Sequence, residues 1–180
     1  MSIEKIQELL DSEIHEKRLI GLLILIEKFK KADDSERKEI FDFYLKNASR
    51  SRINNWDLVD LSAYQIVGGY LLDKPRDVLY KLAESDNLWE KRIAVISCFA
   101  FIRENDFNDC LRINKILLKD NHDLIHKAVG WMLREIGKKN VLVLKDFLKE
   151  NYSDIPRTAL RYSIEKFDGE ERKGWLRGEV

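Results

Sequence analysis

Four residues in the sequence combine side-chain types and spacings that suit chemistry on a flat, charged ligand. Trp56 and Asp60 are four residues apart, so both point from one face of a helix. Arg92 and Trp131 each lie in the front half of a later stretch of the same kind. If these helices are neighbours, the four side chains line one groove that holds an aromatic, a carboxylate, a guanidinium and a second aromatic.

The stretch 123–138 carries the clearest surface pattern. Opposite its apolar stripe, Lys127, Trp131, Arg134 and Lys138 follow one another at spacings of four, three and four. A tryptophan among cations on the non-core face favours nucleic acid, because the cations can meet phosphates and the indole a base or a sugar. The alternative is a tryptophan at the joint between two helix pairs, with a solvated basic flank.

Asp60 has two readings. A lone aspartate inside a helix is usually exposed or paired with a cation, and Asp57 in the first turn suits the helix dipole better. Asp60 lies deeper, on the Trp56 side, where burial raises a carboxyl pKa and a nearby Arg92 lowers it. With Arg92 close, we expect Asp60 to be ionised at neutral pH.

Four further cations extend the expected DNA-binding surface. Arg157 and Arg161 lie one helical turn apart, Arg18 continues the row at the other end, and Lys91 adjoins Arg92. Taken alone, the arginine pair fits an ordinary exposed face at least as well.

The sequence gives little sign of a metal or cofactor. His122 and His126 are one turn apart, a possible metal-ligand spacing, but no cysteine or third histidine completes a set. The chain contains no GxGxxG segment, P-loop lysine motif or serine elbow. We therefore expect no metal site.

Apolar residues recur with a helical period almost throughout. Asp33 and Asp34 suit an N-cap for a helix that begins at Ser35, and Asn54 or Asn55 can cap the helix that holds Trp56. Proline at 75 and 156 suits a first helical turn, and glycine at 169 and 174 is expected to end the last element. The period predicts helices over 2–11, 14–31, 34–48, 55–71, 76–84, 88–104, 107–119, 123–138, 141–150 and 156–167.

Alternate helices look alike. The segment 15–20 (HEKRLI) resembles 89–94 (WEKRIA), and 125–129 (IHKAV) is a weaker echo. These second helices begin about 30–40 residues apart, a spacing typical of helical-pair solenoids. We predict an all-α fold in which helix pairs stack into a curved right-handed solenoid, with the second helices lining its concave groove.

Length and composition bound the remaining possibilities. The 180 residues predict a single domain, 1–180, and 44% hydrophobic residues suffice for a core. The 32 basic and 32 acidic residues give no net charge, which excludes a wholly cationic coat but not a basic face. Cys98 and Cys110 are expected to be buried thiols. Without a signal peptide or an apolar run of membrane length, we expect a cytoplasmic protein with no membrane partner.

Several blocks, in order along most of the chain, resemble the DNA alkylation repair family of HEAT-like-repeat DNA glycosylases, the AlkD type. The blocks are HEKRL at 15–19, EKF at 27–29, NNWDLVD at 54–60, LWEKRIA at 88–94, HKAVGWMLRE at 126–135 and PRTALRYSIEK at 156–166.

The resemblance implies a stack of HEAT-like repeats that hydrolyses the N-glycosidic bond of N3- or N7-alkylated purines in duplex DNA. It implies a catalytic aspartate at Asp60, cleft tryptophans at Trp56 and Trp131, and an arginine at Arg92 that holds a phosphate. It implies no cofactor. The alternative is a non-catalytic module that grips DNA or a protein through the same groove.

The sequence departs from the family at its amino terminus. Family members usually carry further helices before the block that begins here near Leu9, whereas one short helix precedes it in this chain. We expect a monomer, with a partner for the missing helices as the alternative.

Overall fold

The computed structural model describes residues 1–179, and this part of the chain is helical, with no strand. The prediction of an all-α fold is confirmed. In chain order the helices are α1 (Ile3–Leu10), α2 (His15–Lys31), α3 (Asp34–Ser49), α4 (Trp56–Ala63) continued by the π-helical turn η1 (Tyr64–Gly68), α5 (Asp77–Ala83), α6 (Leu88–Arg103), α7 (Asn108–Leu117), α8 (Asp123–Lys139), α9 (Val141–Glu150), α10 (Arg157–Ser163) and α11 (Gly169–Arg177).

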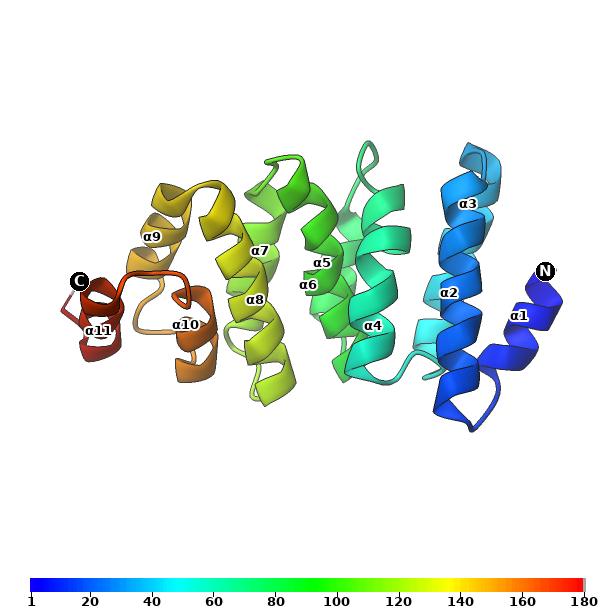
Figure 1. The fold of residues 1–180 in the computed structure, drawn as a ribbon, viewed down its shortest axis with the longest axis horizontal. Coiled ribbons are helices and arrows are strands. Elements are labelled where there is room, and N and C mark those ends of the chain that lie inside the picture. Colours follow the sequence, from blue (N-terminus) through cyan, green and yellow to red (C-terminus); the bar gives the residue numbers. More distant parts are fainter. Residues whose placement is uncertain (180) are drawn as a thin grey trace.

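The second helix of each pair packs on the second helix of the next. Helices α2, α4, α6, α8 and α10 contact one another in that order, and Figure 1 shows them side by side along the molecule. The termini therefore lie at opposite ends of the row. This arrangement brings residues that are about 30 positions apart in sequence onto one surface.

Local hydrogen bonds explain where the helices begin. Asp33 accepts from the backbone N–H of Glu36, whose side chain accepts from the N–H of Asp33, which completes a capping box at α3. Asn55 caps α4 by accepting from the N–H of Trp56 at 2.7 Å, and Asn87 caps α6 in the same way through Trp89. Asp33 is thus the cap of α3, while Asp34 lies inside the helix, and of the two asparagines expected to cap α4 it is Asn55 that does so. Asn55 sets the position of Trp56, and Asn87 sets that of the first turn of α6.

A close approach of α4 and α6 holds the centre of the row together. The α-helical pattern of α4 gives way to η1, and Gly68 there faces α6. A Cβ on Gly68 would overlap the backbone oxygen of Ser97, so only glycine allows this contact. The expected helix over 55–71 is thus one continuous element, but with a π-helical second half.

The carboxyl-terminal end differs from the expectation. Gly169 and Gly174 do not end the last element, because both lie within α11, which the sequence pattern did not predict. Asp168 caps α11 by accepting from two backbone N–H groups. The side chain of Trp175 is 2% exposed and lies beside the Tyr152 and Phe167 rings, so burial of one large aromatic anchors the helix despite its glycines.

Helix α6 is buried nearly all round, as expected for a helix between neighbours. Its buried residues include Cys98, which is a free thiol like the buried Cys110 of α7, as predicted. Among the described residues, Arg92 is the only charged residue that is buried. No helix in this part of the chain is long and apolar enough to cross a membrane.

Candidate functional site

The row of second helices brings the four sequence-predicted site residues together. Trp56 and Asp60 of α4, Arg92 of α6 and Trp131 of α8 line one open pocket of about 320 Å³. The remaining lining residues are Leu124, Lys127, Arg134 and Tyr162. The residues that line the pocket therefore come from four consecutive second helices, α4, α6, α8 and α10.

Asp60 and Arg92 form a two-pronged ion pair at the floor of this pocket. Nε and Nη2 of Arg92 donate to Oδ1 and Oδ2 of Asp60 at 2.8 and 2.7 Å. Nη1 of Arg92 donates to the backbone oxygen of Leu124, at the start of α8. One guanidinium thus connects α4, α6 and α8 and fixes the plane of the carboxylate.

The two partners of this pair differ in their access to solvent. The side chain of Arg92 is 6% exposed and that of Asp60 is 17% exposed. The guanidinium is therefore mostly buried, and three of its N–H donors are engaged within the protein. The phosphate contact that we expected of Arg92 stays a prediction. The carboxylate keeps an open edge, and each of its oxygens retains a lone pair that Arg92 does not use.

Opposing effects act on the pKa of Asp60. Burial raises this pKa, the hydrogen bonds and the charge of Arg92 lower it, and the charge of Asp57 raises it slightly. Burial is the largest of these effects, and the pKa lies above the ordinary aspartate value. Asp60 therefore takes up a proton at a higher pH than a surface aspartate does.

The two tryptophans of the pocket are held differently. The indole of Trp131 packs on Phe99, with ring centroids 6.2 Å apart, and its N–H donates to Glu135 at 3.1 Å. Tyr64 backs Phe99 in turn. Trp56 is 53% exposed, in the first turn of α4. The pocket therefore has one fixed aromatic wall and one open aromatic face.

The cations around Trp131 are less free than the sequence pattern suggests. All three cations predicted on this face of α8 have a carboxylate partner, so the local charge is largely balanced. The pairs are Lys127 with Asp123, Arg134 with Glu165, and Lys138 with Glu135. Asp123 and Glu135 lie on α8 itself, three or four residues from their lysines, whereas Glu165 follows α10 and its pairing with Arg134 could not be assigned from sequence.

The other predicted DNA-binding cations lie apart from this pocket. Arg18 donates to two backbone oxygens of the α1–α2 loop, and Lys91 pairs with Asp120 at 2.7 Å. Both cations therefore hold loops in place. Arg157 and Arg161 are exposed, and neither forms an ion pair with a described residue.

Sequence reasoning did not identify Tyr162 as part of the site, nor His15 as the partner of Asp57. Tyr162 of α10 is 38% exposed and lines the pocket with Lys127. His15 at the start of α2, which does not line the pocket, lies 2.7 Å from a carboxylate oxygen of Asp57. Tyr162 lies in the 156–166 block beside Arg161, and that position was the only signal that pointed to it.

Among the described residues, no group of three or more His, Cys, Asp and Glu side chains is arranged to hold a metal ion. His122 instead caps α8, where its Nδ1 accepts from the backbone N–H of Leu124. The Nε2 of His126 lies 2.6 Å from the backbone oxygen of Asp120. Both histidines are thus engaged in local structure.

A stack of helix pairs with a carboxylate–guanidinium pair between two tryptophans defines a class of helical-repeat proteins with a site on the second helices. The family model described as DNA alkylation repair enzyme matches residues 2–167. The chain therefore belongs to the DNA alkylation repair enzyme family, as the sequence resemblance indicated.

A solved structure has the same fold. The protein described as a predicted DNA alkylation repair enzyme from Enterococcus faecalis superposes with a TM-score of 0.69. The match covers 93% of this chain and 78% of that chain, at 16% sequence identity. No curated protein matches the sequence.

Proposed function

We propose that this member of the DNA alkylation repair enzyme family is a DNA glycosylase that releases cationic N3- or N7-alkylpurines from duplex DNA. The observation that carries the proposal is the Asp60 carboxylate, held in a fixed plane by Arg92 and open on one edge between Trp56 and Trp131. The family membership supports a role in alkylation repair.

The proposed chemistry needs little from the protein. An alkylated purine carries a positive charge and leaves readily, so no strong general acid is required. Asp60 stabilises the positive charge that develops on the sugar and directs a water molecule to C1′. One preorganised electrostatic contact of this kind lowers a barrier by roughly 3–4 kcal/mol, or about 10²–10³ in rate.

Arg92 acts through Asp60 in this proposal. Because its hydrogen bonds to Asp60 and to the Leu124 carbonyl hold the guanidinium in place, Arg92 positions the carboxylate and favours its ionised form. Trp56 offers its exposed indole face to the charged lesion or sugar through a cation–π contact. Trp131, fixed by Phe99, forms the opposite wall.

Release of 7-methylguanine from methylated duplex DNA tests the proposal. We expect the Asp60→Asn variant to lose about 10²-fold or more in release rate while still binding DNA. Asp57→Asn is the matched control, because Asp57 lies on the same helix and pairs with His15 outside the pocket. Equal rates for Asp60→Asn and the wild type contradict the assigned role, provided that both proteins unfold at similar temperatures.

A non-catalytic DNA- or protein-binding module is the second candidate. The observation that favours it is the pairing of both carboxylate oxygens of Asp60 with Arg92, together with the balanced charges on α8. This candidate predicts that the wild type binds duplex DNA or a protein and releases no methylated base. The same release assay therefore separates the two functions.

A further inference from the structure

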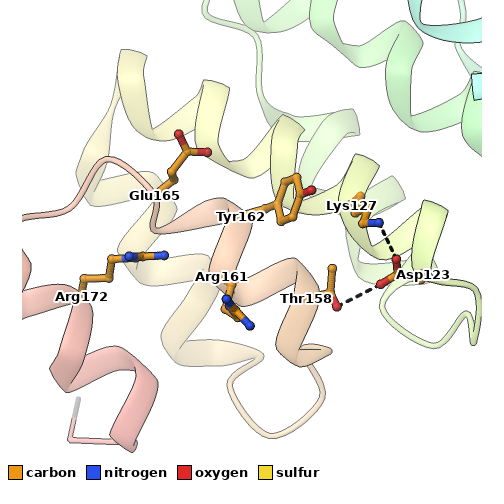
Figure 2. Close-up of a pocket in the computed structure, with 7 residues that line it drawn as sticks. All are labelled: Asp123, Lys127, Thr158, Arg161, Tyr162, Glu165 and Arg172. Atoms are coloured by element: carbon orange, nitrogen blue, oxygen red, sulfur yellow. Dashed lines mark hydrogen bonds and ion pairs between the residues drawn. The ribbon is translucent and has the colours of Figure 1, made fainter. Parts of the chain in front are cut away.

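A second open pocket adjoins the proposed lesion site. It has a volume of about 350 Å³ and lies between α8, α10 and α11. Lys127 and Tyr162 line both pockets, so the two form adjoining parts of one surface. Figure 2 shows Arg172 of α11 on the side of this second pocket away from Lys127, with Arg161 of α10 between them.

The unbalanced charge in the second pocket is positive. Its two carboxylates are engaged, since Asp123 pairs with Lys127 and Glu165 with Arg134. Arg161 and Arg172 form no ion pair with any residue in 1–179. The pocket therefore contains two guanidinium groups whose charges nothing on the described chain neutralises.

Arg172 also carries an unsatisfied hydrogen-bond donor. Its Nε is buried and has no hydrogen-bond partner. A buried charged donor without an acceptor costs free energy, and an arriving anion would remove that cost. Guanidinium groups present N–H donors in a planar fork that matches the oxygens of a phosphate.

We propose that Arg161 and Arg172 bind a backbone phosphate of duplex DNA in this second pocket, beside the nucleotide held at Asp60. The inference deepens the proposed function, on which it rests for DNA as the ligand. The shared wall of Lys127 and Tyr162 places the phosphate next to the lesion pocket. Helix α11, which the sequence pattern did not predict, thereby becomes part of the DNA surface.

The test measures the affinity of the protein for undamaged duplex DNA as a function of salt, so it does not depend on base release. We expect the double variant R161Q/R172Q to lower the salt slope by about 0.9, the value for one phosphate contact. At about 0.1 M salt the same loss weakens binding about eightfold.

The double variant K173Q/R177Q is the matched control. It removes the same total charge from the protein, but both cations come from α11, where Lys173 and Arg177 pair with Glu170 and Glu179 outside the pocket. We expect this control to leave the salt slope unchanged. Thermal unfolding of both double variants, with midpoints near that of the wild type, excludes loss of fold as the cause.

Three results overturn the inference: equal losses in the two double variants, no loss in R161Q/R172Q, or no duplex binding by the wild type. A fourth is stabilisation of the wild type by millimolar inorganic phosphate with a DNA salt slope independent of both arginines, which assigns the pocket to a free anion. Failure of the proposed function looks different, because a wild type that releases no base would still show the arginine-dependent slope.

Discussion

Replacing Arg92 by glutamine isolates the ion pair on which the proposed chemistry depends. The substitution removes both hydrogen bonds to Asp60 and the one to the Leu124 carbonyl. It leaves Asp60, whose side chain is only 17% exposed in the wild type, without its ion-pair partner. We expect the substitution to lower the free energy of unfolding and to shift the pH dependence of base release to higher pH.

The cost to stability follows from burial. Breaking a buried ion pair by removing one partner typically costs about 3–5 kcal/mol, because the remaining charge stays desolvated. The open edge of Asp60 allows water to reach the carboxylate, so we expect a loss near the lower limit, about 3 kcal/mol. Denaturant unfolding of wild type and variant at neutral pH measures the difference.

The effect of Arg92→Gln on the pH dependence of base release comes from the pKa of Asp60. Release requires ionised Asp60, so the rate falls as the pH drops through the pKa of Asp60. Because the hydrogen bonds and the charge of Arg92 lower this pKa, their loss raises it further. We expect the acid limb of the release profile to move to higher pH in Arg92→Gln, measured against spontaneous depurination in the same buffers.

An exposed ion pair supplies the control for stability. Lys38 and Asp42, one turn apart on α3, are both more than half exposed, so Lys38→Gln should leave the free energy of unfolding nearly unchanged. The reasoning is refuted if Arg92→Gln is as mild as Lys38→Gln, or if the acid limb stays in place. A double variant with Asp60→Asn should recover part of the lost stability.

Two further predictions follow from packing and exposure. Gly130→Ala should destabilise the protein by about 1–3 kcal/mol, because the added Cβ would lie 2.6 Å from the backbone oxygen of Ala159 across the α8–α10 contact. Gly169→Ala is the control, because a Cβ there meets nothing within 4 Å. Thermal unfolding of the two variants measures the difference. Trp56→Ala should slow base release about tenfold through loss of a cation–π contact. It should change stability by less than about 1 kcal/mol because Trp56 is half exposed, and a large loss of stability without loss of release contradicts the prediction.

Local patterns in the sequence were sufficient to predict most of the helices and the order in which they stack. Helical periodicity, the caps at Asp33 and Asn55 and the similarity of alternate helices depend on residues a few positions apart, or on a repeat visible by inspection. Once the second helices form a row, Trp56, Asp60, Arg92 and Trp131 must share one surface. The carboxylate and its two aromatic neighbours could therefore be named from the chain alone.

Tertiary structure decided which charges remain free. Asp60 and Arg92 are 32 residues apart, and Arg134 and Glu165 are 31 apart, so neither pairing is visible in a helical stripe. Arg134, an open cation by its spacing, is paired with Glu165 just after α10, whereas Arg172 on α11, which no sequence pattern singled out, forms no ion pair with a described residue.

The chain by itself thus determined the helices, their pairing and the residues of the groove, because helical periods, caps and repeats are short-range properties of the sequence. The packed structure alone decided the depth of Arg92, the existence of α11 and the charge balance of the surface. These depend on contacts between side chains that are distant in sequence, such as Trp175 with Phe167 and Tyr152 or a guanidinium with a carboxylate one helix pair away.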